Sequence, residues 1–318
     1  MYPLLLKPSM KDYLWGGTKL KDEWGFETDK DIAAEAWLLS CHKDGDGVVM
    51  NGALKGKTFS EALSLWGKEA LGERAEKFSD FPILIKFIDA KQSLSVQVHP
   101  DDEYALKNEG EFGKNEMWYI VDCEEGAELI YGFKENISKE EFERRIKDNT
   151  LPEVCNYVPV KKSDVFFIEA GTLHAIGAGI LICEVQQNSN STYRVWDFGR
   201  VGADGKPREL HIDKALDVTK CEKPTRPYGQ VGEVKENNGA SLRELVNCQL
   251  FKSGILKTGE QSNIESNGSF VSLIFLDGEA EVIWNDGSIT AKKGDSIFVP
   301  AGMKIDFKGQ AEILYAYV

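Results

Sequence analysis

Four polar residues of this 318-residue chain have the types and spacing to bind a metal ion. Gln97 and His99 are separated by one valine, so on an extended strand both side chains lie on one face, and Glu116 and His174 follow downstream. Two imidazoles, a carboxylate and an amide oxygen suit a borderline divalent cation, zinc before others, with a position left for water or substrate. Structural zinc sites favour cysteine, which this set lacks. The set therefore predicts a catalytic or substrate-binding ion.

Spacing alone leaves a second interpretation open, because the separations are too long to form a motif. Polar residues at strand ends can simply be satisfied by solvent or by their neighbours. Ser95 shares the predicted face of Gln97 and His99. Lys86 interrupts an apolar run and either extends to an edge or faces a polar cavity. Glu35, between apolar neighbours, is either a buried functional carboxylate or a solvent-facing strand residue.

The stretch from Lys161 to Arg194 must position His174. Alternating apolar residues predict a strand, Ala170-Gly171 predicts a turn, and a second strand carries His174. We expect a β-hairpin that places the imidazole at the mouth of a β-structure. A further apolar strand follows at 180–185.

This stretch has a second copy near the other end of the chain. Residues 292–305 (KKGDSIFVPAGMKI) align with residues 161–174 (KKSDVFFIEAGTLH), with Lys-Lys, Asp, Phe and Ala-Gly at matching positions. A repeated sequence indicates a repeated structural unit. Ile305 stands where the first copy has His174, so the predicted site occurs once.

Composition excludes several classes of function. A net charge of −14 and a pI near 4.9 argue against nucleic acid and anionic membranes as partners. No run approaches the roughly 18 apolar residues that a membrane helix needs, and the apolar run near the start is too short for a signal peptide. Six dispersed cysteines without a CxxC motif suit reduced thiols. We expect a cytoplasmic protein.

The sequence predicts a mainly β fold with few helices. Capping-box patterns at 58–61 and 138–141 begin predicted helices, and helical excursions are expected at about 58–78, 138–148 and 211–218. Residues 221–240 are rich in proline, glycine and charge. We therefore predict a catalytic domain over 1–235 and an all-β domain over 236–318.

Several motifs together carry a family resemblance: SLSVQVHPDDEYA, GKNEMWYIVD, AGTLHAIGAGILICEVQQNSNSTYRVWDFGR and LHIDKALDV. They resemble the type I mannose-6-phosphate isomerases of the short bacterial form, which are cupins. The resemblance spans most of residues 1–220, whereas the tail beyond 240 is similar only in general character. It implies two jelly-roll units, with short helices inserted in the first and a degenerate site in the second.

Carried over position by position, the resemblance implies a role for each site residue. The implied ligands of one zinc ion per chain are Gln97, His99, Glu116 and His174. The other implied site residues are the active-site Arg194, the cavity-lining Lys114, Ser95 and Lys86 near the substrate phosphate, and Glu184 near the reacting carbons. Two departures from the family pattern occur: Ala34-Glu35-Ala36-Trp37 replaces Gly-Glu-Ser-Trp, and Glu169 replaces a proline. The first leaves the role of Glu35 open.

The implied function is zinc-dependent aldose–ketose isomerisation of mannose 6-phosphate and fructose 6-phosphate in mannose metabolism, through a cis-enediol. Glu184 or a metal-bound water is the candidate base, and Arg194 would stabilise the enediolate. The implied partner is a sugar phosphate, and monomer and homodimer both remain open. Two alternatives are a metal-dependent cupin oxygenase and a non-catalytic sugar-phosphate-binding cupin. Arg194 and the glutamine ligand weigh against the first, and the complete ligand set weighs against the second.

Overall fold

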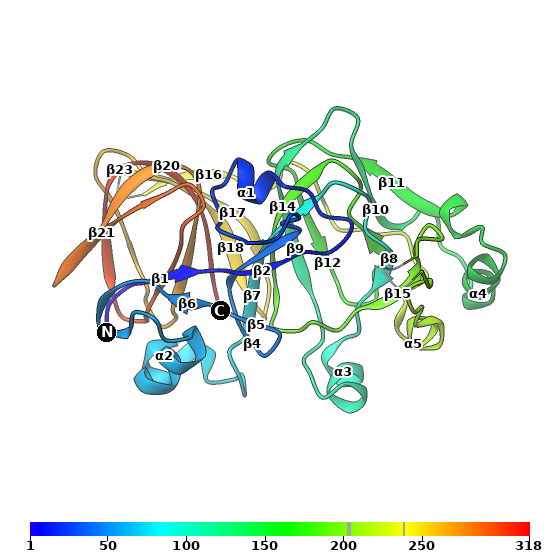
Figure 1. Ribbon diagram of the computed structural model, residues 1–318, viewed down its shortest axis with the longest axis horizontal. Helices are drawn as coiled ribbons and strands as arrows, with labels where there is room; N and C mark the ends of the chain where they lie inside the picture. Colours follow the sequence, from blue (N-terminus) through cyan, green and yellow to red (C-terminus); the bar gives the residue numbers. More distant parts are fainter. Residues whose placement is uncertain (202–204, 238) are drawn as a thin grey trace.

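The computed structural model describes residues 1–201, 205–237 and 239–318, and it is built mainly from antiparallel β-sheets stacked in layers (Figure 1). In the view of Figure 1, two sheets form the right-hand half, with α4 (Lys139–Lys147) and α5 (Ile212–Val218) at its outer end, and a larger sheet forms the left-hand half. The predicted mainly β fold with a few short helices is confirmed. No helix in the described ranges is long and apolar enough to cross a membrane.

The two N-terminal sheets face each other. One has five strands in the order β11 (Cys155–Pro159), β10 (Glu128–Phe133), β13 (His174–Ala175), β8 (Val96–Val98) and β15 (Tyr193–Trp196). The other has six, in the order β12 (Val165–Ile168), β9 (Glu116–Cys123), β14 (Ile180–Gln187), β7 (Ile83–Ala90), β3 (Glu35–Leu39) and β2 (Ser9–Lys11). Trp118 and Ile182 of the six-stranded sheet pack with Leu129 and Tyr131 of the five-stranded sheet, so their core lies between the two.

The ten-stranded sheet completes the fold. Its strands run in the order β16 (Val234–Asn237), β17 (Ala240–Asn247), β18 (Lys252–Lys257), β23 (Lys304–Tyr317), β20 (Val271–Trp284), β22 (Ser296–Val299), β1 (Leu4–Lys7) and β6 (Val48–Val49), while β19 (Ser262–Glu265) pairs with β23 and β21 (Gly287–Lys292) with β20. A small hairpin joins β4 (Cys41–His42) and β5 (Gly45–Asp46). The outer face of the six-stranded sheet packs on this sheet, as Met117 and Phe298 share one core cluster.

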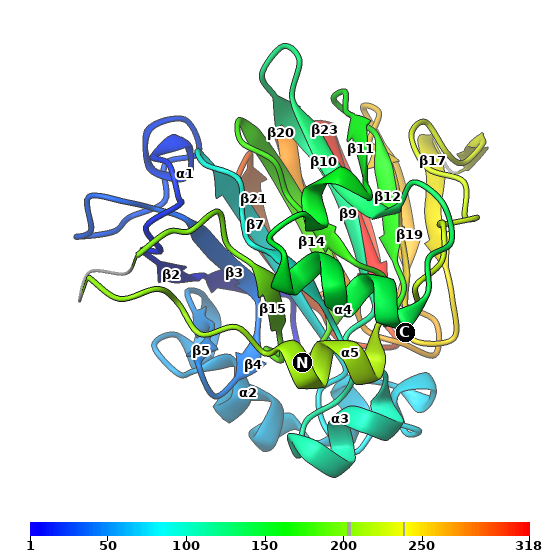
Figure 2. The same ribbon diagram turned by 90° about the vertical axis from the view of Figure 1, so that its right-hand side faces the viewer.

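The helices are short and lie outside the sheets (Figure 2). They are α1 (Lys19–Asp22), α2 (Phe59–Trp66), α3 (Asp102–Asn108), α4 (Lys139–Lys147) and α5 (Ile212–Val218), with 3₁₀ turns at Gly52–Leu54, Lys68–Ala70, Glu73–Ala75 and Leu151–Glu153. The capping box of Thr58 and Glu61 forms as predicted. Helix α3 was not predicted, although Asp101 caps it by accepting from the Tyr104 N–H at 2.9 Å. Helices α4 and α5 cover the five-stranded sheet and bury Val96 and Val98, which turns Gln97 toward the six-stranded sheet.

The predicted hairpin around His174 is wrong. β12 pairs with β9 in the six-stranded sheet, whereas β13 pairs with β10 and β8 in the five-stranded sheet. The turn at Gly171, where φ is +86° and the N–H donates to the His99 carbonyl at 2.8 Å, takes the chain from one sheet to the other. His174 therefore projects from the sheet opposite β12.

The internal repeat is confirmed in the local structure. Asp164 Oδ2 accepts from the Lys161 N–H at 2.8 Å, and Asp295 Oδ2 accepts from the Lys292 N–H at the same distance. A strand, β12 or β22, follows each turn. Ile305, the counterpart of His174, is fully buried in the C-terminal core.

Candidate metal and substrate site

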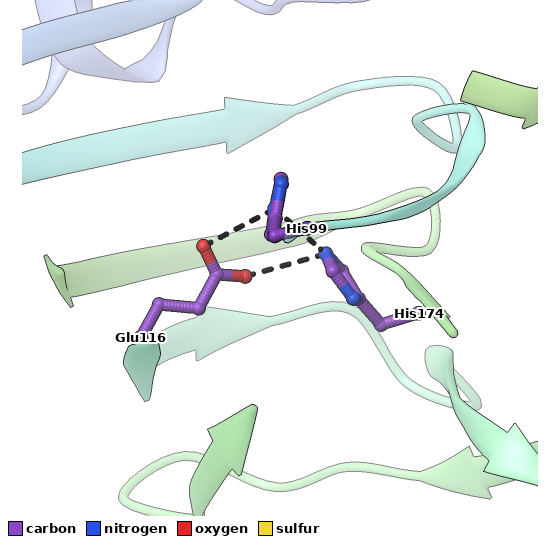
Figure 3. Close-up of side chains that lie close together, drawn as sticks. All are labelled: His99, Glu116 and His174. Atoms are coloured by element: carbon purple, nitrogen blue, oxygen red, sulfur yellow. Dashed lines mark hydrogen bonds and ion pairs between the residues drawn. The ribbon is translucent and has the colours of Figure 1, made fainter. Parts of the chain in front are cut away.

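Three buried side chains from both N-terminal sheets converge on one point (Figure 3). His99 follows β8, His174 begins β13, and Glu116 begins β9 on the facing sheet. His174 Nε2 lies 3.1 Å from His99 Nε2 and 3.3 Å from Glu116 Oε1, and His99 Nε2 lies 3.5 Å from Glu116 Oε2. Each side chain is at most 1% exposed. The fold thus brings together three of the four predicted ligands, widely separated in sequence.

Backbone carbonyls fix both imidazoles in the form that a metal ligand requires. His99 Nδ1 lies 2.9 Å from the Ser191 carbonyl, and His174 Nδ1 lies 2.8 Å from the Thr172 carbonyl. A carbonyl only accepts, so each Nδ1 carries the proton and each Nε2 keeps its lone pair toward the cluster.

Gln97 is the fourth predicted ligand, and it pairs directly with His174 across β8 and β13. Its amide Nε2 lies 3.3 Å from His174 Nε2. A half-turn of the amide would present the oxygen instead, because the two ends have nearly the same shape. The structure therefore places all four predicted ligands at one point.

The cluster suits a divalent cation. Glu116 is fully buried, and within the described ranges its Oε1 accepts no hydrogen bond, whereas Lys114 Nζ lies 2.8 Å from its Oε2. Buried carboxylate oxygens are normally hydrogen-bonded, so the unsatisfied Oε1, which faces His174 Nε2 at 3.3 Å, is available to a cation in addition to Lys114. Two imidazole lone pairs and a carboxylate are the donors that zinc and similar ions take.

A cavity of about 320 Å³ adjoins the cluster. This volume is at the lower end of the ~300–1,000 Å³ range of small-molecule pockets. The predicted site residues in its wall are Ser95, Gln97, Lys86, Lys114, Glu184 and Arg194. The remaining lining residues are Tyr13, Trp15, Glu35, Ile88, Leu94, Trp118, Ile176, Asn190, Thr192 and Arg208. Every predicted site residue therefore lies in the cluster or in the cavity wall.

The Lys86 side chain lines this cavity and does not extend to the edge of the sheet, which decides between the two alternatives left open for this residue. Its ammonium is 3.8 Å from Glu35 Oε2, 3.8 Å from Glu184 Oε2 and 4.6 Å from the centroid of Trp37. Glu35 is also buried, and its Oε2 accepts from the Trp37 indole N–H at 2.7 Å. Glu35 is thus a buried carboxylate beside the cavity and not a solvent-facing strand residue.

Glu184 is held between two lysines on the same wall. Its Oε1 accepts from the Trp118 indole N–H at 3.1 Å and lies 3.7 Å from Lys114 Nζ. Its Oε2 accepts no hydrogen bond from any residue in the described ranges. Lys114 also lies 3.2 Å from His99 Nε2, which links Glu184 to the metal cluster.

Burial and neighbouring charges shift the pKa values of these groups in different directions. Burial lowers the pKa of His99 well below its ordinary value, and it lowers that of His174 to about 4. Burial, with Glu184 nearby, raises the pKa of Glu116. Burial also opposes ionisation of Glu184, but Lys114 and Lys86 outweigh it and lower its pKa to about 2. At neutral pH both histidines are therefore neutral, the form that can bind a metal ion, and Glu184 is ionised.

Arg194 occupies a different part of the wall. Its Nε donates to Ser95 Oγ at 3.2 Å, and its Nη1 donates to the Glu209 carbonyl at 2.9 Å. Arg208, which sequence reasoning missed, lies in the same wall and pairs with Asp197. Nothing in the local sequence distinguished Arg208 from other loop arginines.

The comparisons with known proteins agree with this geometry. Residues 4–135 match the catalytic domain of phosphomannose isomerase type I, and residues 243–318 match the cupin domain of mannose-6-phosphate isomerase. Mannose-6-phosphate isomerase ManA of Bacillus subtilis is 37% identical over 318 residues, with 99% of each chain covered. The chain belongs to the type I phosphomannose isomerase family.

Two further similar proteins support this assignment. Mannose-6-phosphate isomerase of Streptococcus mutans is 36% identical over 316 residues, covering 99% of this chain and 98% of the relative. The crystal structure of mannose 6-phosphate isomerase from Bacillus subtilis superposes with a TM-score of 0.92 at 32% identity over the whole of both chains. The cupin-domain match also extends the family likeness into the tail, where we expected only a general similarity.

Proposed function

We propose that this chain is a zinc-dependent mannose-6-phosphate isomerase that interconverts D-mannose 6-phosphate and D-fructose 6-phosphate. The observation that carries the proposal is the buried cluster of His99, Glu116 and His174 beside a cavity lined by cations, in a member of this family. The proposed ligands of one zinc ion per chain are Gln97, His99, Glu116 and His174. When bound, the ion supplies Lewis-acid polarisation of the sugar's carbonyl or hydroxyl oxygens.

The charge of the site suits a sugar phosphate once a divalent cation is present. Apart from Arg208, which pairs with Asp197, three carboxylates and three cationic side chains face the cluster and cavity: Glu35, Glu116, Glu184, Lys86, Lys114 and Arg194. Their formal charges cancel, so a divalent cation leaves two net positive charges. A dianionic phosphate would balance them, and it would find a local positive field on an otherwise acidic protein. We assign Ser95 and Lys86 to the phosphate end of the substrate.

Isomerisation moves a hydrogen between C2 and C1 of the sugar, with a cis-enediol between substrate and product. Glu184 is the proposed base, because its Oε2 is ionised and accepts no hydrogen bond from the described residues. Arg194 is proposed to stabilise the developing enediolate, since a guanidinium keeps its charge at neutral pH. Lys114, between Glu116 and Glu184, would hold both carboxylates in place.

Other parts of the proposal concern the whole chain. We propose a catalytic domain over 1–235 and a C-terminal domain with a degenerate site over 236–318. All six cysteines are free thiols, which suits a reducing cytoplasm.

The test is turnover of mannose 6-phosphate to fructose 6-phosphate by the purified protein, before chelation, after chelation, and after zinc is restored. We expect activity to disappear with the metal and to return with zinc. Turnover that persists in protein shown by metal analysis to be metal-free would overturn the zinc assignment. Iron-dependent oxygen uptake without isomerisation would favour the oxygenase alternative. A folded, zinc-loaded protein that binds the sugar phosphate without turnover would favour the binding protein.

A further inference from the structure

The two histidines of the cluster are oriented by carbonyls of very different origin. His174 contacts the carbonyl of Thr172, only two residues earlier, so local geometry fixes this bond. His99 contacts the carbonyl of Ser191, which is 92 positions away in sequence. The orientation of His99 therefore depends on whatever holds the loop over residues 188–192, hereafter the 188–192 loop.

Hydrogen bonds within residues 186–191 shape part of this loop. Gln186, fully buried, donates from Nε2 to the carbonyls of Gln187 and Ser189, both at 2.7 Å. The Ser191 N–H donates to Ser189 Oγ at 3.2 Å. These bonds define the turn, but they all lie within one short segment. They do not fix the distance between the Ser191 carbonyl and His99 on another strand.

Glu111 holds the loop from outside. Its Oε2 accepts from the Asn190 N–H at 3.3 Å and from Ser191 Oγ at 3.5 Å. Its Oε1 lies 2.7 Å from Lys43 Nζ and 3.7 Å from His42 Nε2. One carboxylate oxygen thus serves the loop and the other serves a partly exposed ion pair, so substitutions can separate the two roles.

The same loop forms part of the substrate cavity. Asn190 and Thr192 line it, and Asn190 Nδ2 donates to Asp44 Oδ2 at 2.9 Å. Two further external anchors are Asp44, whose hydrogen bond reaches the Asn190 side chain only, and the Pro82 carbonyl, which accepts from the Asn188 N–H at 3.0 Å. Glu111 contacts Ser191 itself, the residue whose carbonyl meets His99.

We propose that Glu111 is a positioning residue for the metal centre. By holding Asn190 and Ser191, it keeps the Ser191 carbonyl on His99 Nδ1, which keeps the proton there and the Nε2 lone pair toward Glu116 and His174. Without Glu111 the loop can withdraw, and His99 can rotate or carry its proton on Nε2. The inference rests on the proposed function in one respect, namely that a divalent ion occupies the cluster.

The test compares three variants of the full-length protein. Zinc affinity is measured by competition with a chelator, the geometry of the site by the absorption spectrum of bound Co²⁺, and stability by thermal unfolding of the metal-free protein. We expect Glu111→Ala to weaken zinc binding about tenfold and to change the Co²⁺ spectrum, as loss of outer partners of a metal ligand does. Glu111→Gln should retain most of the affinity, because the amide oxygen can accept from both loop donors. Lys43→Met should leave the affinity unchanged.

A matched control lies two residues away. Glu109 forms an ion pair with Lys214 at 2.6 Å and is 23% exposed, against 19% for Glu111, but it contacts Tyr193 and Lys214 rather than the loop. Glu109→Ala should therefore lose stability without losing zinc affinity. If Glu111→Ala does not fold, Glu111→Asp replaces it, since the shorter side chain withdraws the carboxylate from the loop.

Two results would overturn the proposal. One is a Glu111→Ala protein with wild-type zinc affinity and an unchanged Co²⁺ spectrum, even if its melting temperature falls, since that result assigns Glu111 a structural role only. The other is equal loss in Glu111→Gln and Lys43→Met, which would assign the effect to the ion pair. Both are measured as zinc binding by the variants relative to wild-type protein that binds zinc, whereas failure of the proposed function is measured as absence of isomerisation by the wild-type protein.

Discussion

At the scale of single residues, Arg194 is the cation best placed to act on charge that develops during the reaction. Its hydrogen-bond acceptors, Ser95 Oγ and the Glu209 carbonyl, are uncharged, and within the described ranges no carboxylate forms an ion pair with it. Arg194→Ala should therefore reduce kcat by about 10²–10³-fold, the usual effect of removing a donor that stabilises an oxyanion. The measurement is steady-state turnover of mannose 6-phosphate, together with zinc content.

His174→Ala provides the opposite case. It removes a lone pair from the cluster, so zinc content should fall together with turnover, whereas Arg194→Ala should keep its zinc. Near-normal turnover in Arg194→Ala would exclude the proposed role of the arginine.

The pKa of His174 predicts how acid affects the metal-free protein. This pKa is about 4 in the fold and near 6.5 in an unfolded chain, so between these values the unfolded state binds the extra proton. The free energy of unfolding should therefore fall as the pH drops from about 6.5 to 4, by up to ~1.4 kcal/mol per pH unit from this group. His174→Leu lacks this titration, and urea unfolding of both proteins across this range should give a shallower pH slope for the variant. Equal slopes would contradict the assignment.

The sequence indicated which side chains meet in the cluster and cavity, but it did not indicate the contacts that orient them. Gln97 and His99 were placed on one strand face by alternation with buried valines, and this is how they lie. The acceptor for His99 is a backbone carbonyl at Ser191, a group that every residue carries. No side-chain pattern marks such a contact, so only the folded chain reveals it.

At the scale of elements, the internal repeat offers a matched pair of glycines. Gly171 and Gly302 occupy the same turn with φ of +86° and +77°, but an added Cβ would lie 2.8 Å from the Val218 carbonyl at Gly171 and would meet no described atom within 4 Å at Gly302. Gly302→Ala should cost about 1–2 kcal/mol of stability from backbone strain alone. Gly171→Ala should cost more and should also weaken zinc binding, because this turn leads to His174. Urea unfolding and chelator competition measure both effects, and equal stability losses would contradict the prediction.

The same turn shows why element-level prediction succeeded for strands and failed for their pairing. Alternation and turn residues correctly indicated a strand, a turn and a second strand around Gly171. An Ala-Gly turn serves equally well in a hairpin and in a passage between two sheets, because glycine sets only the local backbone direction. Which sheet receives His174 depends on β8 and β10, whose positions the local sequence does not encode.

At the scale of the whole molecule, one core joins the two proposed domains. A single cluster contains Ile85 and Met117 of the six-stranded sheet together with Leu4, Phe298 and Leu314 of the ten-stranded sheet. We therefore expect the metal-free protein to unfold in one cooperative transition in urea, with coincident tryptophan fluorescence and far-ultraviolet circular dichroism. A separate fragment of residues 236–318 should be unstable, because it lacks β1 and this shared core. Two resolved transitions, or a stable fragment, would contradict the expectation.

The pairing of β1 with β22 also has a consequence for how the protein is made. Leu4 lies opposite Phe298 in the ten-stranded sheet, so β1 leaves the ribosome long before its partner strand β22 is synthesised. At roughly 5–20 residues per second, β1 must wait on the order of 15–60 s before the edge that faces β22 is paired, although β6 can already cover its other edge. During that interval it is exposed to aggregation and to chaperones. Synonymous codon changes that slow translation between the two strands should lengthen this exposure and lower the soluble yield of an otherwise identical protein.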